Sequence, residues 1–318
     1  MILLTGGAGF IGSHLAEALL ESGRRVVVVD DFNDYYDPAR KRANLAGIIG
    51  RPGLEVVEAD IRDRERMEEL FARRRFSRVI HLAARAGVRP SLARPLLYQD
   101  VNIGGTLAIL EAARKTGTEK IIFASSSSVY GDCPRLPLRE DEPDLLPVSP
   151  YGLTKLAGEH ICRVYHRQYG IRIAALRFFT VFGPRQRPDM AIHLFSRRIL
   201  AGEEIPFYGD GSSRRDYTFI ADIVAGIQAA LEADLDFEVF NLGGGHSISL
   251  AGLIELLGDK LGRRPVLKRL PFQPGDVVAT LADVTRAREL LGYRPLTDLS
   301  RGLDVFIEWF RNREGRPA

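Results

Sequence analysis

The chain has 318 residues, 45% hydrophobic and 27% charged, which is ordinary for a water-soluble globular protein with one core or two closely packed lobes. No apolar run approaches the roughly 18 residues of a membrane span, and Met1 leads directly into a strand and a glycine turn, so we expect no membrane segment or signal peptide. The net charge of +3 comes from short, scattered arginine clusters rather than from one stripe, which argues against a nucleic-acid partner.

The first half of the chain alternates β-branched runs with amphipathic helices. Predicted strands cover residues 1–5, 25–30, 54–59, 79–83, 120–125 and 171–177. Predicted helices cover 13–22, 64–73, 101–114 and 151–169. Apolar strands alternating with helices predict βαβ units, and right-handed crossovers then give an α/β fold with a Rossmann-type doubly wound parallel sheet.

The pattern becomes less regular after Gly183-Pro184, where loops rich in Gly, Pro and Arg separate shorter elements. We therefore expect a Rossmann domain over residues 1–180 and a smaller lobe over 181–318 that closes over a ligand. Two segments of the second half have the pattern of the first domain, so parts of 221–242 are assigned to it.

A glycine fingerprint directly follows the first strand. Gly6, Gly9 and Gly12 lie in a strand–turn–helix context, with Phe10 and Ile11 between them. The missing side chains let the backbone turn tightly and approach a pyrophosphate, which binds where free N–H groups point from a helix N-terminus. The fingerprint predicts a dinucleotide site.

Carboxylates at the ends of the next two strands indicate which dinucleotide binds. Asp30 comes about twenty residues after the fingerprint, where a carboxylate accepts hydrogen bonds from the adenosine ribose and repels a 2′-phosphate. Asp31 adds to this repulsion, so NAD is expected rather than NADP. Asp60 and Ile61 are candidates for the adenine edge, although Asp60 is equally typical of a helix N-cap.

Two motifs predict a reacting centre. Tyr151 and Lys155 are four residues apart, hence on one helix face, and a nearby ammonium together with the positive nicotinamide would lower the pKa of the tyrosine and make it a base. The run Ser125–Ser128 follows a strand at the edge of the sheet that faces ligands, where a hydroxyl can bind the substrate oxygen. Each motif has a plainer interpretation, as a solvated helix face and as a serine-rich capping loop.

The order of these motifs resembles the extended short-chain dehydrogenase/reductase family, which includes sugar-nucleotide 4-epimerases, 4,6-dehydratases and decarboxylases. The resemblance extends over nearly the whole chain. It implies that Tyr151 is the base, Lys155 its partner and Ser126 the assisting hydroxyl. The further cofactor contacts that it implies are Asn33, Leu82, Ala83, Ala84 and the structural asparagine Asn102, and no metal is expected.

The residues before Tyr130 separate the reactions of this family. The 4,6-dehydratases resemble Thr-Asp-Glu-Val-Tyr there, because eliminating water needs an added acid and base. Here Ser127 and Ser128 occupy those positions as supporting hydroxyls, and neither can serve as a carboxyl acid. The resemblance therefore implies a 4-epimerase, which removes a hydride from C4, lets the 4-keto sugar rotate and returns the hydride to its other face.

The second lobe resembles the UDP-glucuronate 4-epimerases, for example at 177–184 and 187–190. Thr180 and Gln273 stand where UDP-galactose 4-epimerases have asparagine and arginine. A glucuronate carboxylate needs hydroxyl or guanidinium donors, so Thr180, Arg187 and Arg89 are candidates, although either arginine could equally hold a loop. The resemblance assigns the UDP end to Arg215 at the diphosphate, Pro206 and Tyr208 at the uracil, and Asp276 at the nucleotide.

Three alternatives stay open from the sequence. A neutral sugar such as UDP-glucose or UDP-galactose, or an N-acetylhexosamine form, would use the same mechanism. A non-catalytic dinucleotide-binding regulator would keep the fold, and an NADPH reductase is disfavoured by Asp30. The family also implies a homodimer through the helices at 101–114 and 151–169, whose apolar stripes would equally suit core burial. Cys133 and Cys162 lack metal or redox spacing, so we expect unpaired thiols in a cytoplasmic protein.

Overall fold

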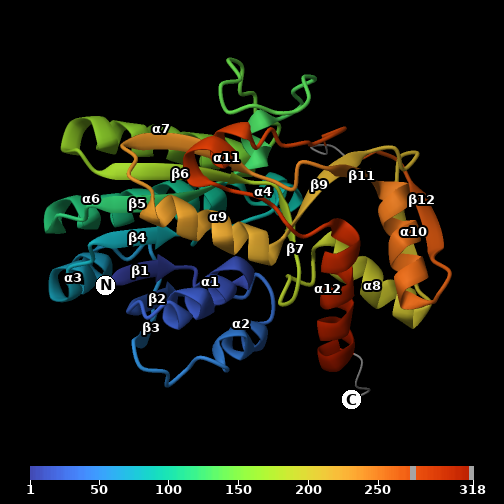
Figure 1. Ribbon diagram of the computed structural model, residues 1–318, viewed down its shortest axis with the longest axis horizontal. Helices are drawn as coiled ribbons and strands as arrows, with labels where there is room; N and C mark the ends of the chain where they lie inside the picture. Colours follow the sequence, from blue (N-terminus) through green and yellow to red (C-terminus); the bar gives the residue numbers. More distant parts are fainter. Residues whose placement is uncertain (273–276, 315–318) are drawn as a thin grey trace.

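A seven-stranded parallel sheet forms the centre of the structure, a computed structural model that describes residues 1–272 and 277–314 (Figure 1). The strand order is β10-β6-β5-β4-β1-β2-β3. The strands are β1 (Ile2–Thr5), β2 (Val26–Asp30), β3 (Leu54–Glu58), β4 (Arg78–His81), β5 (Lys120–Ser126), β6 (Arg172–Phe178) and β10 (Phe237–Leu242). The order reverses between β1 and β4, and the carboxyl ends of the strands beside such a reversal form the usual ligand crevice of an open α/β sheet.

Helices cover both faces of this sheet (Figure 1). On one face, an apolar core layer separates the sheet from α1 (Phe10–Glu21), α2 (Pro38–Leu45) and α9 (Ile220–Glu232). On the other face, a second core layer separates the sheet from α3 (Arg64–Arg74), α6 (Gly105–Thr116) and α7 (Pro150–Tyr169). Neighbouring strand residues enter opposite layers, as with Leu3 and Leu4, because side chains alternate across a strand. This two-sided burial explains the continuous apolar strands of the sequence and confirms the predicted α/β Rossmann fold.

The predicted strands begin and end within two residues of the observed ones, whereas two helices differ more. The first helix begins at Phe10 rather than Ser13, because Gly9 is its N-cap. The helix expected at 101–114 is the last part of a longer helical segment: α4 (Val88–Ala93), α5 (Pro95–Tyr98) and a π-helical turn at Gln99–Gly104 come before α6. A side chain at Gly105 would approach Ile61 Cδ1 to 2.4 Å, so α6 passes close to the end of β3.

The smaller lobe lies beside the carboxyl ends of the central strands (Figure 1). Its strands are β7 (Thr180–Phe182), β9 (Arg214–Phe219) and β11 (Ser247–Ser249) in one sheet, with β8 (Glu204–Tyr208) and β12 (Val266–Leu270) in another. Its helices are α8 (Ala191–Ala201), α10 (Leu250–Leu261) and α12 (Leu299–Glu314), whereas α11 (Thr285–Leu291) packs against β10 and α9.

The chain leaves this lobe twice, first for α9 and β10 and again for α11, which contacts both. β10 pairs in parallel with β6, and α9 covers the same sheet face as α1. Within residues 1–272 and 277–314 there is no helix long and apolar enough to cross a membrane.

Candidate active site

A cavity of about 390 Å³ opens at the carboxyl ends of the central strands. Twenty of the residues singled out in the sequence line it: Gly6, Gly9, Phe10, Ile11, Gly12, Asp30, Asp31, Asn33, Asp60, Ile61, Leu82, Ala83, Ala84, Ser126, Ser127, Ser128, Tyr151, Lys155, Thr180 and Arg187. They come from eight segments of the chain, and the fold places them along one continuous surface.

The glycine fingerprint forms one wall of the cavity and leaves no room for side chains. A Cβ on Gly12 would lie 2.1 Å from the Gly6 carbonyl oxygen, and a Cβ on Gly6 would lie 2.8 Å from Ala83 N. Gly6 also has a φ of +71°, which favours glycine. Gly9 is the N-cap of α1, so the free N–H groups at the start of that helix face the cavity. This cradle fits the pyrophosphate of a dinucleotide.

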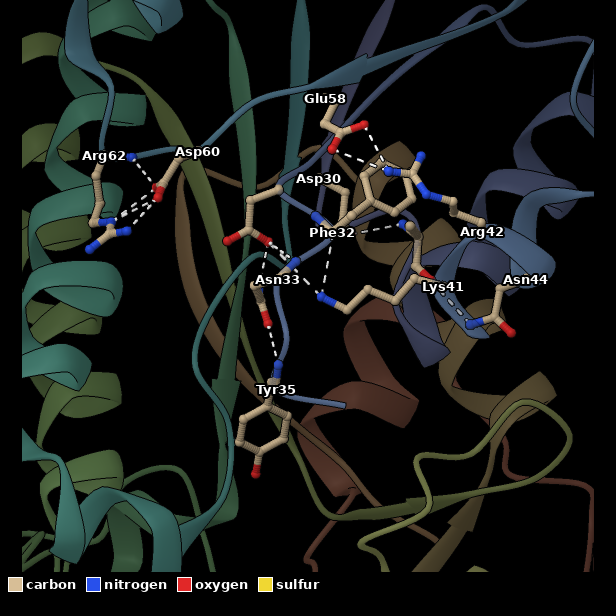
Figure 2. Close-up of polar contacts among 12 residues, drawn as sticks. Asp30, Phe32, Asn33, Tyr35, Lys41, Arg42, Asn44, Glu58, Asp60 and Arg62 are labelled. Carbon is tan, nitrogen blue, oxygen red and sulfur yellow. Dashed lines mark hydrogen bonds and ion pairs between the residues drawn. The ribbon is translucent and has the colours of Figure 1, made fainter. Parts of the chain in front are cut away.

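Asp30 lines the end of the cavity where the sequence predicts the adenosine, and Figure 2 shows its contacts with Phe32 and Lys41. Its carboxylate accepts hydrogen bonds from Ala8 N and Phe32 N, each at 3.0 Å. Burial raises the pKa of Asp30, and the Lys41 ammonium, 3.7 Å from Asp30 Oδ1, acts against this rise. A fixed carboxylate here fits a ribose diol and disfavours a 2′-phosphate, as expected for NAD.

Asp60 follows β3 and pairs with Arg62 at 2.5 Å. Burial would raise the pKa of Asp60, but hydrogen bonds from Arg62 outweigh this effect and lower it. The N-cap of α3 is Asp63, whose side chain accepts from Arg66 N, so the alternative that Asp60 caps this helix is wrong.

Two residues of the predicted reacting centre, Tyr151 and Lys155, lie on α7. Ser149 caps this helix by accepting from Gly152 N at 3.1 Å, and Pro150 begins it, so Tyr151 lies in the first turn, where it lines the cavity. One turn later, Lys155 Nζ donates to the Ala124 carbonyl at 2.7 Å.

The environment acts differently on the two groups. Burial raises the pKa of Tyr151, and its hydrogen bond with Ser126 and the Arg187 guanidinium offset this rise only in part. Burial lowers the pKa of Lys155 to about 8. The partnership of Lys155 with the tyrosine, expected from the motif, stays a prediction.

The serine run has the capping role considered for it, and its role as a substrate-binding hydroxyl stays a prediction. Ser126 Oγ accepts from Ser128 N at 3.1 Å and so caps the 3₁₀ turn Ser127–Tyr130. The same hydroxyl donates to Ser128 Oγ at 3.2 Å and bonds Tyr151. Capping therefore fixes the hydroxyl beside the tyrosine, where a substrate oxygen can meet both.

The opposite wall carries donors suited to an anion. Arg187 binds Asp189 in a bidentate pair, with both N···O distances at 3.0 Å, and its guanidinium lies 5.3 Å from the centre of the Tyr35 ring. Thr180 begins β7 on the same side. The carboxylates among the described lining residues are Asp30 and Asp31 at the end of β2 and Asp60 after β3, away from Tyr151.

Five candidates lie outside the described cavity lining: Asn102, Arg89, Pro206, Tyr208 and Arg215. Asn102 is buried behind the wall, where it accepts from Arg85 N and donates to the Arg85 carbonyl and, at 2.9 Å, to Thr154 Oγ1, so it has a structural role. Arg89 lies 4.6 Å above the Tyr208 ring and so connects α4 with β8.

Arg215 donates to the Arg214 carbonyl at 2.8 Å. Pro206 and Tyr208 alternate along β8 with the buried Ile205 and Phe207, so they lie on its outer face. Gln273 and Asp276 lie outside the described residues.

Sequence reasoning missed four polar lining residues, Tyr35, Tyr36, Lys41 and Arg85. Tyr35 belongs to the segment 32–38, from which only Asn33 was assigned. Lys41 lies on α2 after the N-cap Asp37 and faces Asp30, a contact that depends on how α2 folds back toward β2.

Comparison with known proteins gives the family. Residues 2–243 match the NAD dependent epimerase/dehydratase family. The chain belongs to this family. It is 40% identical to a UDP-glucuronate 4-epimerase of Thermodesulfobacterium geofontis, over 96% of this chain and 95% of that protein.

Solved structures of family members agree with this assignment. The UDP-glucuronic acid 4-epimerase from Bacillus cereus, solved with UDP-glucuronic acid and NAD, is 38% identical, with a TM-score of 0.93 over 98% of this chain and 99% of that one. The UDP-glucose 4-epimerase of Thermotoga maritima, solved with UDP-glucose, is 36% identical, with a TM-score of 0.90 over 98% of both chains. The cradle and Asp30 fit the NAD on which the family depends.

Proposed function

We propose that this protein is an NAD-dependent UDP-glucuronate 4-epimerase that forms UDP-galacturonate. One observation carries the proposal: Tyr151 and Ser126 face a cavity whose sugar end has hydroxyl and guanidinium donors, and whose described carboxylates all lie at the adenosine end. That arrangement supports removal and return of a hydride at C4 without a further acid for eliminating water. Similarity to the UDP-glucuronate enzymes supports the sugar.

The residues supply proton transfer and orientation. When bound, NAD supplies the hydride acceptor and then the donor. Tyr151, as phenolate, takes the proton of the C4 hydroxyl while the C4 hydride leaves, and the Ser126 hydroxyl holds the oxygen through both directions of the reaction. After the 4-keto sugar has rotated, the same tyrosine returns the proton to the C4 oxygen.

The carboxylate of the sugar would bind at Thr180 and Arg187. A guanidinium presents a planar fork to a carboxylate, and Asp189 already holds two of the donors of Arg187 in a fixed orientation. The UDP part would extend past Arg89 and Tyr208 toward Arg215, with Pro206 beside the uracil. Gln273 and Asp276 complete this proposed substrate site.

The test is turnover of UDP-glucuronate and UDP-glucose in parallel, with NAD supplied and both products separated by chromatography. We expect UDP-galacturonate from the first and little conversion of the second. Arg187→Met should reduce kcat/KM for UDP-glucuronate about 100-fold, the loss of one charge-assisted contact of about 3 kcal/mol, and should affect UDP-glucose less. Interconversion of UDP-glucose alone would keep the mechanism and refute the glucuronate assignment.

A homodimer formed through α6 and α7 is part of the proposal. Leu153 and Val164 on α7 are 58% and 54% exposed, and Leu96 on the adjoining α5 is 74% exposed, an apolar face that a second copy would cover. Val164→Glu should give a monomer in light scattering, whereas Leu296→Glu, at an 81% exposed site on the smaller lobe, should leave the dimer intact. A wild-type monomer at micromolar concentration would refute the dimer.

A cytoplasmic location completes the proposal. Cys133 and Cys162 are both free thiols, as expected in a reducing compartment. Cell fractionation tests this directly, and recovery outside the cytoplasm would contradict it.

A further inference from the structure

Three consecutive residues at the end of β5 each bind a different residue on one face of α7. The Ala124 carbonyl accepts from Lys155 Nζ at 2.7 Å, the Ser125 hydroxyl donates to the Glu159 carboxylate, and Ser126 bonds Tyr151. Positions 151, 155 and 159 are successive turns of one helix face. Two of these contacts belong to the reacting centre described above, and the third does not.

The third contact is part of a buried anchor. Arg177 on β6 forms a bidentate pair with Glu159, with Nε···Oε1 at 2.9 Å and Nη2···Oε2 at 2.8 Å, and the two side chains are 3% and 6% exposed. The Arg177 guanidinium also lies 4.8 Å from the centre of the Tyr130 ring. Tyr130 in turn donates to Asn241 Oδ1 on β10 at 2.7 Å. The anchor therefore connects α7 with β5, β6 and β10.

Close packing beside Glu159 restricts where α7 can lie on β5. A Cβ on Gly158 would lie 2.4 Å from the tip of the Phe123 ring on β5. The helix therefore rests directly on the strand, and the bidentate pair fixes how far along the strand each turn lies. A displacement of this anchor would move Lys155 and Tyr151 together.

The anchor also contributes charge. The groups facing Lys155 are Glu159 and Cys162 from α7 and His81 from β4. Glu159 is itself faced by Arg177 from β6. Tyr151 is faced by Arg187 from the opposite wall. Burial raises the pKa of Cys162 and lowers that of His81 to about 3, so both are neutral at pH 7. Of these described groups, Glu159 is the anion that favours the charged form of Lys155.

We propose that Glu159 is a positioning residue for the epimerisation. Through Arg177 and Ser125 it holds α7 in register with β5, and its negative charge keeps Lys155 protonated. This role of Glu159 requires epimerisation at C4 but does not depend on glucuronate as the sugar. It can therefore be tested with whichever UDP-sugar the protein converts. Its failure is therefore distinct from failure of the proposed substrate.

The first experiment is the pH dependence of kcat for Glu159→Gln, which keeps the side-chain shape and removes the charge. Losing the anion favours neutral Lys155, so the alkaline limb of the profile should move down by about one pH unit, which lowers kcat about tenfold on that limb. KM and NAD content should stay within about twofold of wild type, because Glu159 does not line the cavity. An unchanged alkaline limb would overturn the proposal.

A matched variant separates positioning from stability. Asp222 is a buried carboxylate on α9 that accepts from Leu296 N and Thr297 N, far along the chain from α7, so Asp222→Asn should destabilise the protein without moving the limb. If both variants move it equally, Glu159 has only a structural role. Should Glu159→Gln fail to fold, Ser125→Ala removes one hydrogen bond to the same carboxylate, and a wild-type kcat and profile there would also overturn the proposal.

Discussion

Gly12→Ala is the substitution whose effect follows most directly from the geometry. The new Cβ would lie 2.1 Å from the Gly6 carbonyl oxygen and 2.7 Å from Gly7 Cα, both backbone atoms that cannot rotate away. The first turn of α1 must therefore retreat by roughly 1 Å, which breaks hydrogen bonds of about 2.9 Å from its N–H groups to a pyrophosphate. Losing two such charge-assisted bonds, at about 1.5 kcal/mol each, weakens NAD binding about 100-fold.

The assay is titration calorimetry with NAD, with circular dichroism to show that the fold is kept. Overpacking at one site costs about 1–3 kcal/mol, which a domain of this size can lose and still fold. Gly47→Ala is the matched control, because a Cβ there meets nothing within 4 Å. Wild-type affinity in a folded Gly12→Ala protein would refute the argument that the pyrophosphate needs this close approach.

Three further predictions concern the base, its charged neighbour and the smaller lobe. Tyr151→Phe should lower kcat by about 1,000-fold with NAD content unchanged, and turnover near wild type would remove Tyr151 from the mechanism. Burial lowers the pKa of Lys155 to about 8, and a lysine is charged below its pKa and neutral above it, so kcat should fall as pH rises through about 8; a profile flat to pH 10 would contradict this. Asp216 accepts from the backbone N–H groups of Gly244, Gly245 and Ala282. Asp216→Ala should therefore lower the free energy of unfolding, measured in urea, by about 3 kcal/mol or more. The control Asp210→Ala, at an exposed site, should change it by less than about 1 kcal/mol.

Local patterns made much of the cofactor wall predictable from the sequence. Gly6, Gly9 and Gly12 act within one strand–turn–helix segment, and Tyr151 and Lys155 share one helix, so spacing alone relates them. The strands were predictable because burial on both faces makes them continuously apolar.

The residues that were missed depend on tertiary contacts. Lys41 reaches Asp30 only because α2 folds back toward β2, and its own neighbourhood, rich in charge, resembles an ordinary exposed helix. Glu159 was unpredictable for the same reason. A glutamate in the middle of an amphipathic helix predicts a solvated side chain, whereas here its pairing with Arg177 on β6 accompanies its burial. Asn102 was expected at the start of a helix and instead lies in a π-helical turn, which no local sequence pattern predicts.

The return of β10 to the central sheet bears on how the protein is made. A nascent chain that ends at residue 180 has β6 as an open edge, with unpaired backbone groups available to other chains. The strand that covers this edge leaves the ribosome only after the first strands of the smaller lobe, β7, β8 and β9, have emerged. The first domain thus cannot mature as an independent unit during synthesis, and gene fusions or truncations placed at the apparent boundary should yield aggregating fragments rather than a separate cofactor-binding module.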